Sequence, residues 1–331
     1  MSTESSATKR VFSGIQPSGA IHLGNYLGAI SQWVDMQGAY DAVFCIVDLH
    51  ALTVPKEPGV IAEGTLAIGR ILLALGIDPE QATLFVQSHV RQHTELAWMM
   101  QAYTAYGELS RMTQFKEKSE QQAGYISTGL FTYPTLQAAD ILLYDTDVVP
   151  VGDDQRQHIE LTRDAALRFN ARHGETFVIP EHRIPQAGAR IMDLQHPENK
   201  MSKSVDSPAG TIGLLDTPKE IEKKLKRAVT DTDGEVRFDR VNKPGVSNLL
   251  EILAAATGGD PVALAERYQQ YGPLKADAAE ALISLLEPFQ ARYNELEDGD
   301  VRAAFRTGAA KAVAVAEPVM ERVRVASGLL I

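Results

Sequence analysis

The chain has 331 residues, an apolar fraction of 44% and a formal net charge of −11. This length predicts two domains, and this composition predicts a globular protein with a full buried core. The acidic balance disfavours binding of nucleic acid over the whole surface, because phosphate binding depends on Lys and Arg. Any RNA contact must therefore use local basic patches.

The N-terminal residues, the apolar runs and the cysteine content indicate where the protein is located. Residues 1–10 are polar and lack the apolar stretch of a signal peptide, so we expect a disordered N-terminal tip. No apolar run reaches the length of a membrane span. Cys45 is the only cysteine, which excludes an intrachain disulfide and fits a reducing compartment. We therefore expect a cytoplasmic protein with no membrane partner.

The first third of the chain alternates short apolar runs with helical patterns. The runs are rich in β-branched and aromatic residues, which is typical of buried parallel strands. Alternation of strand and helix predicts a doubly wound sheet. We expect strands at 11–13, 42–47 and 83–87, and helices at 23–36, 60–75 and 95–106.

The alternation continues to about residue 208, where helices take over. Thr217, Pro218 and Glu220 form a capping box with proline at the first helical position, so a helix begins there. We expect helices at 134–144, 154–173, 218–230, 245–257, 261–271, 275–297 and 300–327, strands at 147–151 and 177–179, and a hairpin near 236–238. The sequence thus predicts an α/β fold, with a doubly wound parallel-sheet, Rossmann-like domain over 11–207. A mostly α-helical C-terminal domain over 208–331 follows, and its last helix is a candidate for packing back on the first domain.

Several phosphate-binding and metal-binding motifs are excluded. Gly14 and Gly19 have the spacing of a phosphate loop, but Ala20 and Ile21 stand where a Walker A loop needs Lys and Ser or Thr. No G-x-G-x-x-G follows a strand, which disfavours a dinucleotide site. Neither H-E-x-x-H nor C-x-x-C occurs, so we predict no protein-held metal.

The segment His22-Leu-Gly-Asn25 falls at the first strand–helix connection. Open parallel sheets bind ligands at the carboxyl ends of their strands, and a helix N-terminus there attracts anions. The segment is either a plain turn with a glycine or part of a nucleotide site. In the second case His22 donates to a phosphate, and Gly24 lets a base pack on the backbone.

The segment Lys200-Met-Ser-Lys-Ser204 places two lysines three positions apart. It is either an exposed basic turn or a loop that neutralises the β- and γ-phosphates of ATP as they depart. Catalysis of nucleotidyl transfer is mostly positioning and charge stabilisation, which two lysines supply. Met201 would anchor such a loop by burial.

A polar trio lies on one face of a predicted helix. Tyr133, Gln137 and Asp140 are spaced i, i+4 and i+7. The face is either a solvent-exposed stripe or the wall of a pocket that also contains Phe12, Val149 and Val151. In the pocket, Asp140 would accept a hydrogen bond from a substrate, and its buried charge would need a partner.

These motifs resemble those of the class I aminoacyl-tRNA synthetases, whose signatures are His-Ile-Gly-His and Lys-Met-Ser-Lys-Ser. The second signature is present in full, and the first has Asn25 in its last place. The wider sequence is similar to bacterial tryptophanyl-tRNA synthetases at SGIQPSGAIHLGNYLGAI (13–30), FCIVDLHALT (44–53), ELSRMTQFKEK (108–118), AADILLY (138–144), VVPVGDDQRQHIELTR (148–163) and GARIM (188–192). The similarity spans nearly the whole chain.

The resemblance implies specific site residues. The ATP site would comprise Gln16, Pro17, Ser18, Gly24, Asn25, Gly152, Asp153, Asp154, Ile191, Lys200, Met201, Ser202, Lys203 and Ser204, with His22, Gln16, Lys200 and Lys203 catalytic. The tryptophan site would comprise Asp140, Tyr133, Gln137, Phe12, His50, Val149, Val151 and Gln155, with Asp140 accepting the indole N–H. Gln137 replaces the usual Met and Asp153 the usual Glu, which leaves the role of Gln137 open.

The implied reaction has two steps. ATP and L-tryptophan give tryptophanyl-adenylate and pyrophosphate, and the tryptophanyl group then passes to the 3′ end of tRNA(Trp). Mg²⁺ would enter on the ATP phosphates, the helical domain would bind the tRNA anticodon, and the protein would be a homodimer. Three alternatives remain: a tyrosyl-tRNA synthetase, another nucleotidyl transferase of the superfamily, and a non-catalytic synthetase paralogue.

Overall fold

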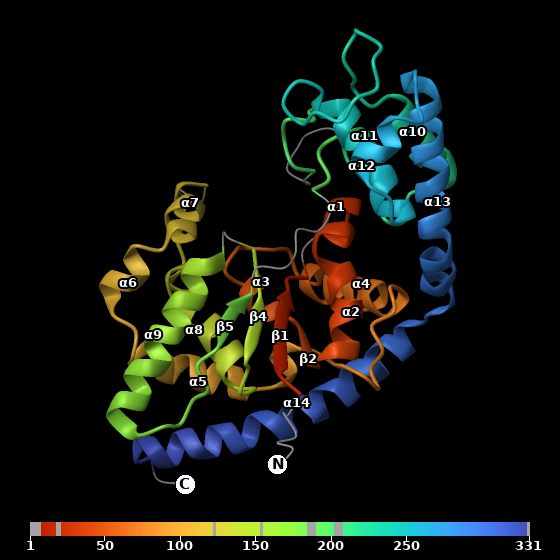
Figure 1. The fold of residues 1–331 in the computed structure, drawn as a ribbon. Coiled ribbons are helices and arrows are strands. Elements are labelled where there is room, and N and C mark those ends of the chain that lie inside the picture. The colour runs from red at the N-terminus through yellow and green to blue at the C-terminus, as the bar shows by residue number, and fades with distance from the viewer. Residues whose placement is uncertain are drawn as a thin grey trace, which may run out of the picture.

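A five-stranded parallel sheet forms the centre of the N-terminal part of the molecule (Figure 1). The computed structural model describes residues 8–17, 21–121, 124–152, 155–183, 190–201 and 208–329. The strands are β1 (Arg10–Ile15), β2 (Asp41–Ile46), β3 (Thr83–Val86), β4 (Val148–Pro150) and β5 (Glu181–Arg183). Their order is β3-β2-β1-β4-β5, and every pair is parallel. The predicted doubly wound sheet is confirmed, and its order reverses between β1 and β4.

Helices cover both faces of this sheet and build the helical C-terminal part. The elements between the strands are α1 (Leu23–Asn25), the π-helical turn η1 (Tyr26–Ile30), α2 (Ser31–Ala39), α3 (Asp48–Ala51), α4 (Val60–Ala74), η2 (Gln87–His89), α5 (Gln92–Gln101), α6 (Tyr106–Ser110), α7 (Thr113–Gln121), α8 (Thr128–Leu142) and α9 (Arg156–His173). The elements after β5 are α10 (Pro218–Lys226), α11 (Pro244–Thr257), α12 (Pro261–Ala265), α13 (Tyr271–Glu295) and α14 (Asp298–Ser327).

Alternation along the strands divides the core into two layers. Val11 and Phe44 point into a cluster with α4 and the helical part, whereas Phe12 and Val43 point into a cluster with α5, α8 and α9. This is the period-two pattern of a sheet that is buried on both faces. The near-continuous apolar sequence of β2 follows directly from it.

Some expected elements are misplaced. Residues 177–179 are not a strand; β5 begins four residues later, and Phe177 is buried against Phe169 instead. Residues 236–238 form no hairpin. The helix expected at 95–106 begins earlier, at Gln92, and ends at Gln101. The capping box at Thr217 is present, and Pro218 is the first helical residue of α10.

The helix α14 crosses beneath the sheet domain after α13 has run down from the helical lobe (Figure 1). Gly308 of α14 lies against the backbone of β3, and Phe305 lies against Gly69 of α4. Arg324 near the end of α14 donates to Glu95 of α5 over 2.7 and 2.6 Å. The last helix therefore joins three elements from the first third of the chain, namely α4, β3 and α5.

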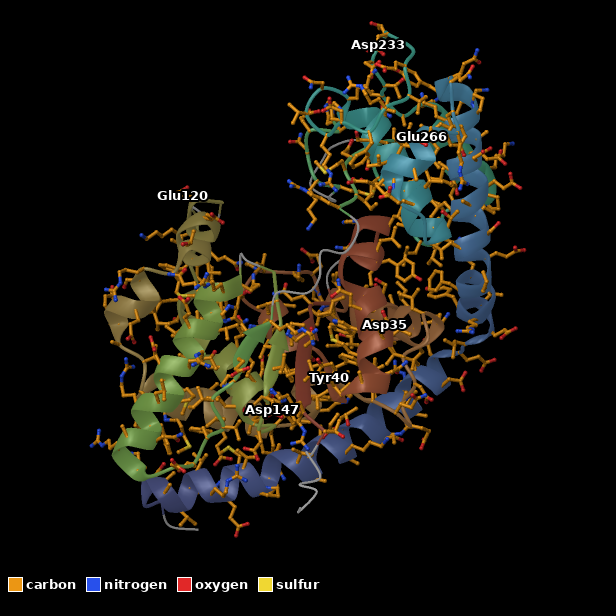
Figure 2. All side chains as sticks on the ribbon, viewed as in Figure 1. Asp35, Tyr40, Glu120, Asp147, Asp233 and Glu266 are labelled. Atoms are coloured by element: carbon orange, nitrogen blue, oxygen red, sulfur yellow. The ribbon has the colours of Figure 1, made fainter. Side chains whose placement is uncertain are left out.

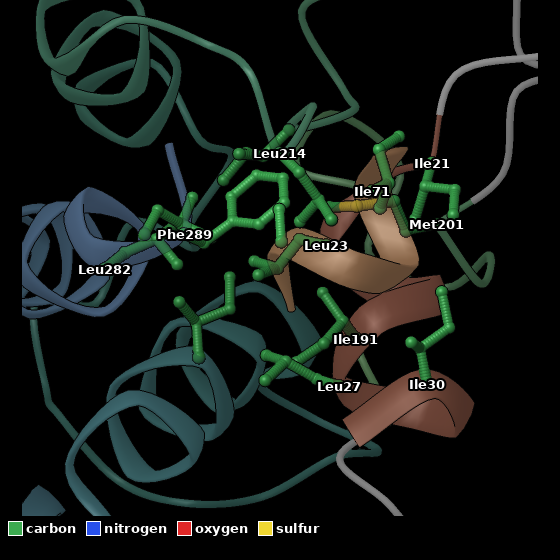
Figure 3. Packing of buried hydrophobic residues seen from close by; sticks show 14 of the residues in the cluster. Ile21, Leu23, Leu27, Ile30, Ile71, Ile191, Met201, Leu214, Leu282 and Phe289 are labelled. Atoms are coloured by element: carbon green, nitrogen blue, oxygen red, sulfur yellow. The ribbon is translucent and has the colours of Figure 1, made fainter. Parts of the chain in front are cut away.

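The helical lobe also packs against the start of the first helix. Leu23 lies among Leu214 and Phe289 of the lobe on one side and Ile191 on the other (Figure 3). All four side chains are buried. At the outer end of the lobe, Asp233 marks a loop far from this contact (Figure 2). The two parts of the chain thus share one hydrophobic cluster at the edge that carries the sequence motifs.

Candidate active site

A cavity of about 690 Å³ opens where the strand order reverses. The end of β1 and the residues that follow β4 form its walls, from Phe12 to Gln16 and from Val149 to Gly152. Crevices at such a reversal are the general ligand sites of doubly wound sheets. The wall between these two strands is completed by η1 and α8.

Gly24 and Asn25 reach this cavity from the start of the first helix. His22 caps that start: its Nδ1 accepts from the Asn25 N–H over 3.3 Å, while Asn25 Oδ1 accepts from the His22 N–H over 3.2 Å. Because Nδ1 accepts, the hydrogen of the ring lies on Nε2. The asparagine at the end of the motif therefore completes a reciprocal cap, which fixes the backbone of Gly24.

The π-helical turn η1 follows immediately. It interrupts the continuous helix that we expected from residue 23 to 36. Gly28 and Ile30 of this turn line the cavity. Single π-turns inside helices are frequent at functional sites because they re-aim the side chains around them.

Lys200 lines the same cavity from a distant part of the sequence. Its segment pairs with Met192, and the Met201 N–H donates to the carbonyl of Ile191 over 3.1 Å. Met201 is 2% exposed, and its Cβ lies 3.5 Å from the position that a Cβ on Gly24 would occupy. The burial expected for Met201 is present, and it holds Lys200 beside the first helix.

Asp140 is the buried charge of the site. It is 1% exposed and lines the cavity from α8. Its Oδ2 accepts from His50 Nε2 over 2.8 Å. Its Oδ1 accepts from Gln87 Nε2 and from His93 Nδ1, over 2.6 Å each. The partners that a buried carboxylate needs are thus supplied by three side chains.

These donors decide the protonation of Asp140. Burial raises the pKa of a carboxyl group, but the hydrogen bonds and charges of His50 and His93 outweigh it and bring the pKa of Asp140 to about 2. Asp140 is therefore an ionised acceptor at neutral pH. The neighbouring Tyr133 hydroxyl bonds His158 Nε2 over 2.7 Å, and burial raises the pKa of Tyr133.

The structure brings together all eight side chains that the sequence assigned to tryptophan. Each of them lines the cavity: Phe12, His50, Tyr133, Gln137, Asp140, Val149, Val151 and Gln155. Of the residues assigned to ATP, those that line it are Gln16, Gly24, Asn25, Gly152 and Lys200. Their individual roles remain predictions.

Other predicted residues lie elsewhere. His22, Pro17, Met201 and Ile191 are buried and do not line the cavity. The side chain of Ile191 is 1% exposed in the core, which leaves only its backbone for the predicted contact with adenine. Six predicted residues lie outside the described part of the chain: Ser18, Asp153, Asp154, Ser202, Lys203 and Ser204.

Sequence reasoning missed several residues of the site. Trp33 stacks on Phe44 with 4.6 Å between ring centroids and also forms part of the cavity wall. Gln87 and His93, behind Asp140, were not singled out at all. Gln87 directly follows the carboxyl end of β3. Because parallel sheets bind ligands at this end of their strands, its position in the sequence could have marked it as a candidate site residue.

The cavity, its ionised Asp140 and the Lys200 that lines it agree with the comparisons with known proteins. Residues 4–287 match the family described as tRNA synthetases class I (W and Y). The chain therefore belongs to the class I tRNA synthetases of this family, as the sequence motifs indicated.

Individual relatives show which members of this family the chain is similar to. The chain is 52% identical over 325 residues to the tryptophan–tRNA ligase of Caldanaerobacter subterraneus subsp. tengcongensis, covering 98% of this chain and 99% of that one. It is 51% identical to the tryptophan–tRNA ligase of Oceanobacillus iheyensis, covering 97% of this chain and 99% of that one. The resemblance to bacterial tryptophanyl-tRNA synthetases is thereby confirmed.

Solved structures agree. The tryptophanyl-tRNA synthetase of Mycoplasma pneumoniae superposes with a TM-score of 0.88 at 36% identity, covering 98% of this chain and 99% of that one. That of Campylobacter jejuni, in complex with ADP and tryptophan, gives 0.84 at 35%, covering 97% and 100%. The tyrosyl-tRNA synthetase of Archaeoglobus fulgidus shares the fold, with a TM-score of 0.67 at 22% identity, covering 86% and 90%. Within the described ranges, every helix is too short or too polar to span a membrane.

Proposed function

We propose that this chain is a tryptophan–tRNA ligase, which activates L-tryptophan with ATP and transfers it to tRNA(Trp). One observation carries the proposal. Gly24 and Lys200, which are far apart in the sequence, line the same cavity as the ionised Asp140. The cavity therefore joins a site that suits the phosphates of a nucleotide to a site that accepts one hydrogen bond from a second substrate.

Tryptophan occupies the end of the cavity formed by α8. Asp140 accepts the indole N–H, and Phe12 and Val149 cover the apolar ring. A site built around such an acceptor rejects analogues without the donor by about 10⁴–10⁵, because the buried charge is then left unpaired. The polar side chain of Gln137 on the same wall faces the cavity and contacts the amino acid.

ATP occupies the end formed by the first helix and the Lys200 segment. The adenine ring packs on the backbone of Gly24, and Gly152 lies beside the adenosine. Lys200, with Lys203 of the same motif, neutralises the departing pyrophosphate. His22 holds Gly24 and Asn25 in place through its cap, and its donation to the α-phosphate stays a prediction.

The reaction needs little side-chain acid–base chemistry. The tryptophan carboxylate attacks the α-phosphorus and expels pyrophosphate, and a ribose hydroxyl of the tRNA then attacks the activated carbonyl. Rate comes from orientation and from stabilisation of the developing charge. Mg²⁺ accompanies ATP through its phosphate oxygens, which suits an ion that retains water and takes few protein ligands.

The helical lobe after residue 208 binds the tRNA, and the protein acts in the cytoplasm, where tRNA charging takes place. A homodimer is supported by an exposed apolar face: Leu52 is 64% and Trp98 74% exposed, and both flank a second cavity of about 400 Å³. Exposed apolar patches of this kind mark interaction surfaces. Tyr133 lines this second cavity and the first one, so the face adjoins the proposed tryptophan site.

Amino-acid-dependent exchange of pyrophosphate into ATP tests the proposal. Tryptophan should support exchange, and tyrosine should not do so at equal concentration. Charging of a tRNA(Trp) transcript should follow in a second assay. Exchange with tyrosine only would identify a tyrosyl-tRNA synthetase. Exchange without charging would favour another nucleotidyl transferase, and tryptophan binding without exchange would favour a non-catalytic paralogue.

A further inference from the structure

Two side chains hold Asp140 from behind the cavity. Gln87 and His93 are both 0% exposed, and neither is among the residues that line the cavity. Both donate to Oδ1 of Asp140 over 2.6 Å. An oxygen of a carboxylate offers two lone-pair directions, so these two donors fill Oδ1.

The second oxygen of Asp140 is only half filled. Within the described chain, Oδ2 accepts from His50 over 2.8 Å, and His50 itself lines the cavity. Oδ2 therefore retains one acceptor position on the side of the cavity. That position fits one N–H donor, and its direction depends on how the two donors at Oδ1 fix the carboxylate plane.

Neighbouring groups fix the orientations of both Gln87 and His93. Gln87 Oε1 accepts from the Leu49 N–H over 3.1 Å, so its amide nitrogen must face Asp140. His93 Nε2 lies 2.8 Å from the Tyr144 hydroxyl, and its ring stacks on Phe85 with 5.8 Å between centroids. Because an ionised carboxylate only accepts, the hydrogen that joins His93 to Asp140 belongs to Nδ1 of the ring.

We propose that His93 is a positioning residue for the selection of tryptophan. Its Nδ1–H, with Gln87, holds the carboxylate plane of Asp140 so that Oδ2 meets the indole N–H. His93 acts through Asp140 and does not touch the substrate. The inference rests on the proposed function, because it requires tryptophan in the cavity.

The test compares three variants of the full-length protein by pyrophosphate exchange. His93→Leu removes the donor, His93→Asn retains an N–H donor near the Nδ1 position, and Tyr144→Phe removes only the outer hydroxyl. Each is measured with tryptophan and with β-(3-benzothienyl)alanine, in which sulfur replaces the indole N–H. This analogue occupies the ring space without offering a hydrogen to Asp140.

His93→Leu should raise the KM for tryptophan about 10- to 100-fold, as expected for loss of a hydrogen bond to a charged group. The KM for ATP should not change, and the preference for tryptophan over the analogue should fall about tenfold. His93→Asn should recover most of the preference, and Tyr144→Phe should retain it. An equal loss for both amino acids, or an unchanged preference in His93→Leu, would overturn the role of His93.

A measurement on the unsubstituted protein keeps the test open if His93→Leu fails to fold. The protein is labelled with ¹⁵N in its histidines, and a long-range ¹H–¹⁵N correlation spectrum is recorded with and without tryptophan. In both spectra His93 should carry its hydrogen on Nδ1. A ring with Nδ1 unprotonated would contradict the geometry. Absence of any exchange with tryptophan in the unsubstituted protein would instead refute the proposed function. The two failures are therefore distinguishable.

Discussion

Gly308 of the last helix lies directly on the carbonyl group of Leu84 in β3. A Cβ at Gly308 would stand 1.8 Å from that oxygen, far inside van der Waals contact. The helix therefore approaches the backbone of β3, an edge strand of the sheet, at a position where only glycine fits. This contact joins residues more than two hundred positions apart in the sequence.

Gly308→Ala should lower the stability of the sheet domain by about 1–3 kcal/mol, because α14 must move off β3 to accept the methyl group. Gly299→Ala is the matched control: it lies in the same helix and would meet nothing within 4 Å. That substitution should stay within about 0.5 kcal/mol of the parent. Urea unfolding measures both, and equal effects would contradict the close approach.

Asp140→Asn should weaken the use of tryptophan. The amide places an N–H₂ among donors from His50, Gln87 and His93, so at least one pair of donors faces each other. We expect the KM for tryptophan in pyrophosphate exchange to rise about 100-fold or more, since a charged acceptor is lost. Unchanged preference for tryptophan would remove Asp140 from its assigned role.

Asp140 should also contribute to the dependence of stability on pH. Its pKa in the folded protein is about 2, below the ordinary value of about 3.9, so the folded state binds fewer protons. The ionised carboxylate therefore stabilises the fold above about pH 4, and this contribution of about 2 kcal/mol is lost as pH falls toward 2.

Urea unfolding of the parent protein and of Asp140→Asn at several pH values between 2 and 5 measures this contribution. The difference between the two free energies of unfolding should be constant above pH 4 and should shrink below it. A difference that stays the same down to pH 2 would show that Asp140 does not titrate in this window.

Gln137→Met should have a moderate effect. Gln137 lines the cavity, and the described chain provides no hydrogen-bond partner for its amide, so a bound amino acid is the partner available to it. We expect the KM for tryptophan to rise about 2- to 10-fold, as for one neutral hydrogen bond, with the KM for ATP unchanged. An unaltered KM would show that the amide only fills space.

Lys243→Met should destabilise the helical lobe. The Lys243 side chain is 1% exposed, donates to Asp231 over 3.2 Å and also bonds Asp233 and the Tyr271 hydroxyl. Its removal leaves two carboxylates side by side without their cation; because these carboxylates are 27% and 59% exposed, we expect a cost of about 1–2 kcal/mol. Lys219→Met, at an exposed position of α10, is the control and should change stability by less than about 0.5 kcal/mol. Thermal unfolding distinguishes the two.

Much of the fold could be predicted because its signals are local. The apolar run of β2 and the capping box at Thr217 each depend on residues close in sequence. β5 could not be found, because all three of its residues are exposed and none of them has the apolar pattern of a buried strand. The start of α5 was misread because its cap, Arg91, makes no side-chain hydrogen bond to the helix.

One wall of the cavity could also be predicted from local sequence spacing, whereas the side chains that bind Asp140 from behind could not. Tyr133, Gln137 and Asp140 share one helix face, which spacing alone reveals. The partners of Asp140 come from residues 47, 53 and 90 positions away, and only the folded chain brings them together. No sequence spacing relates His93 to Asp140.

The course of α14 has a consequence for synthesis on the ribosome. This helix follows every other described element, yet it covers β3 and contacts α4 and α5. A nascent chain that has not yet emerged as far as α14 leaves the part of the sheet domain that α14 covers exposed to water, so we expect this domain to complete its fold only after the last helix has been made. Chains arrested before residue 298 should be protease-sensitive in the sheet domain. On this view a chain interrupted before the last helix has no folded site at which to spend ATP and tryptophan.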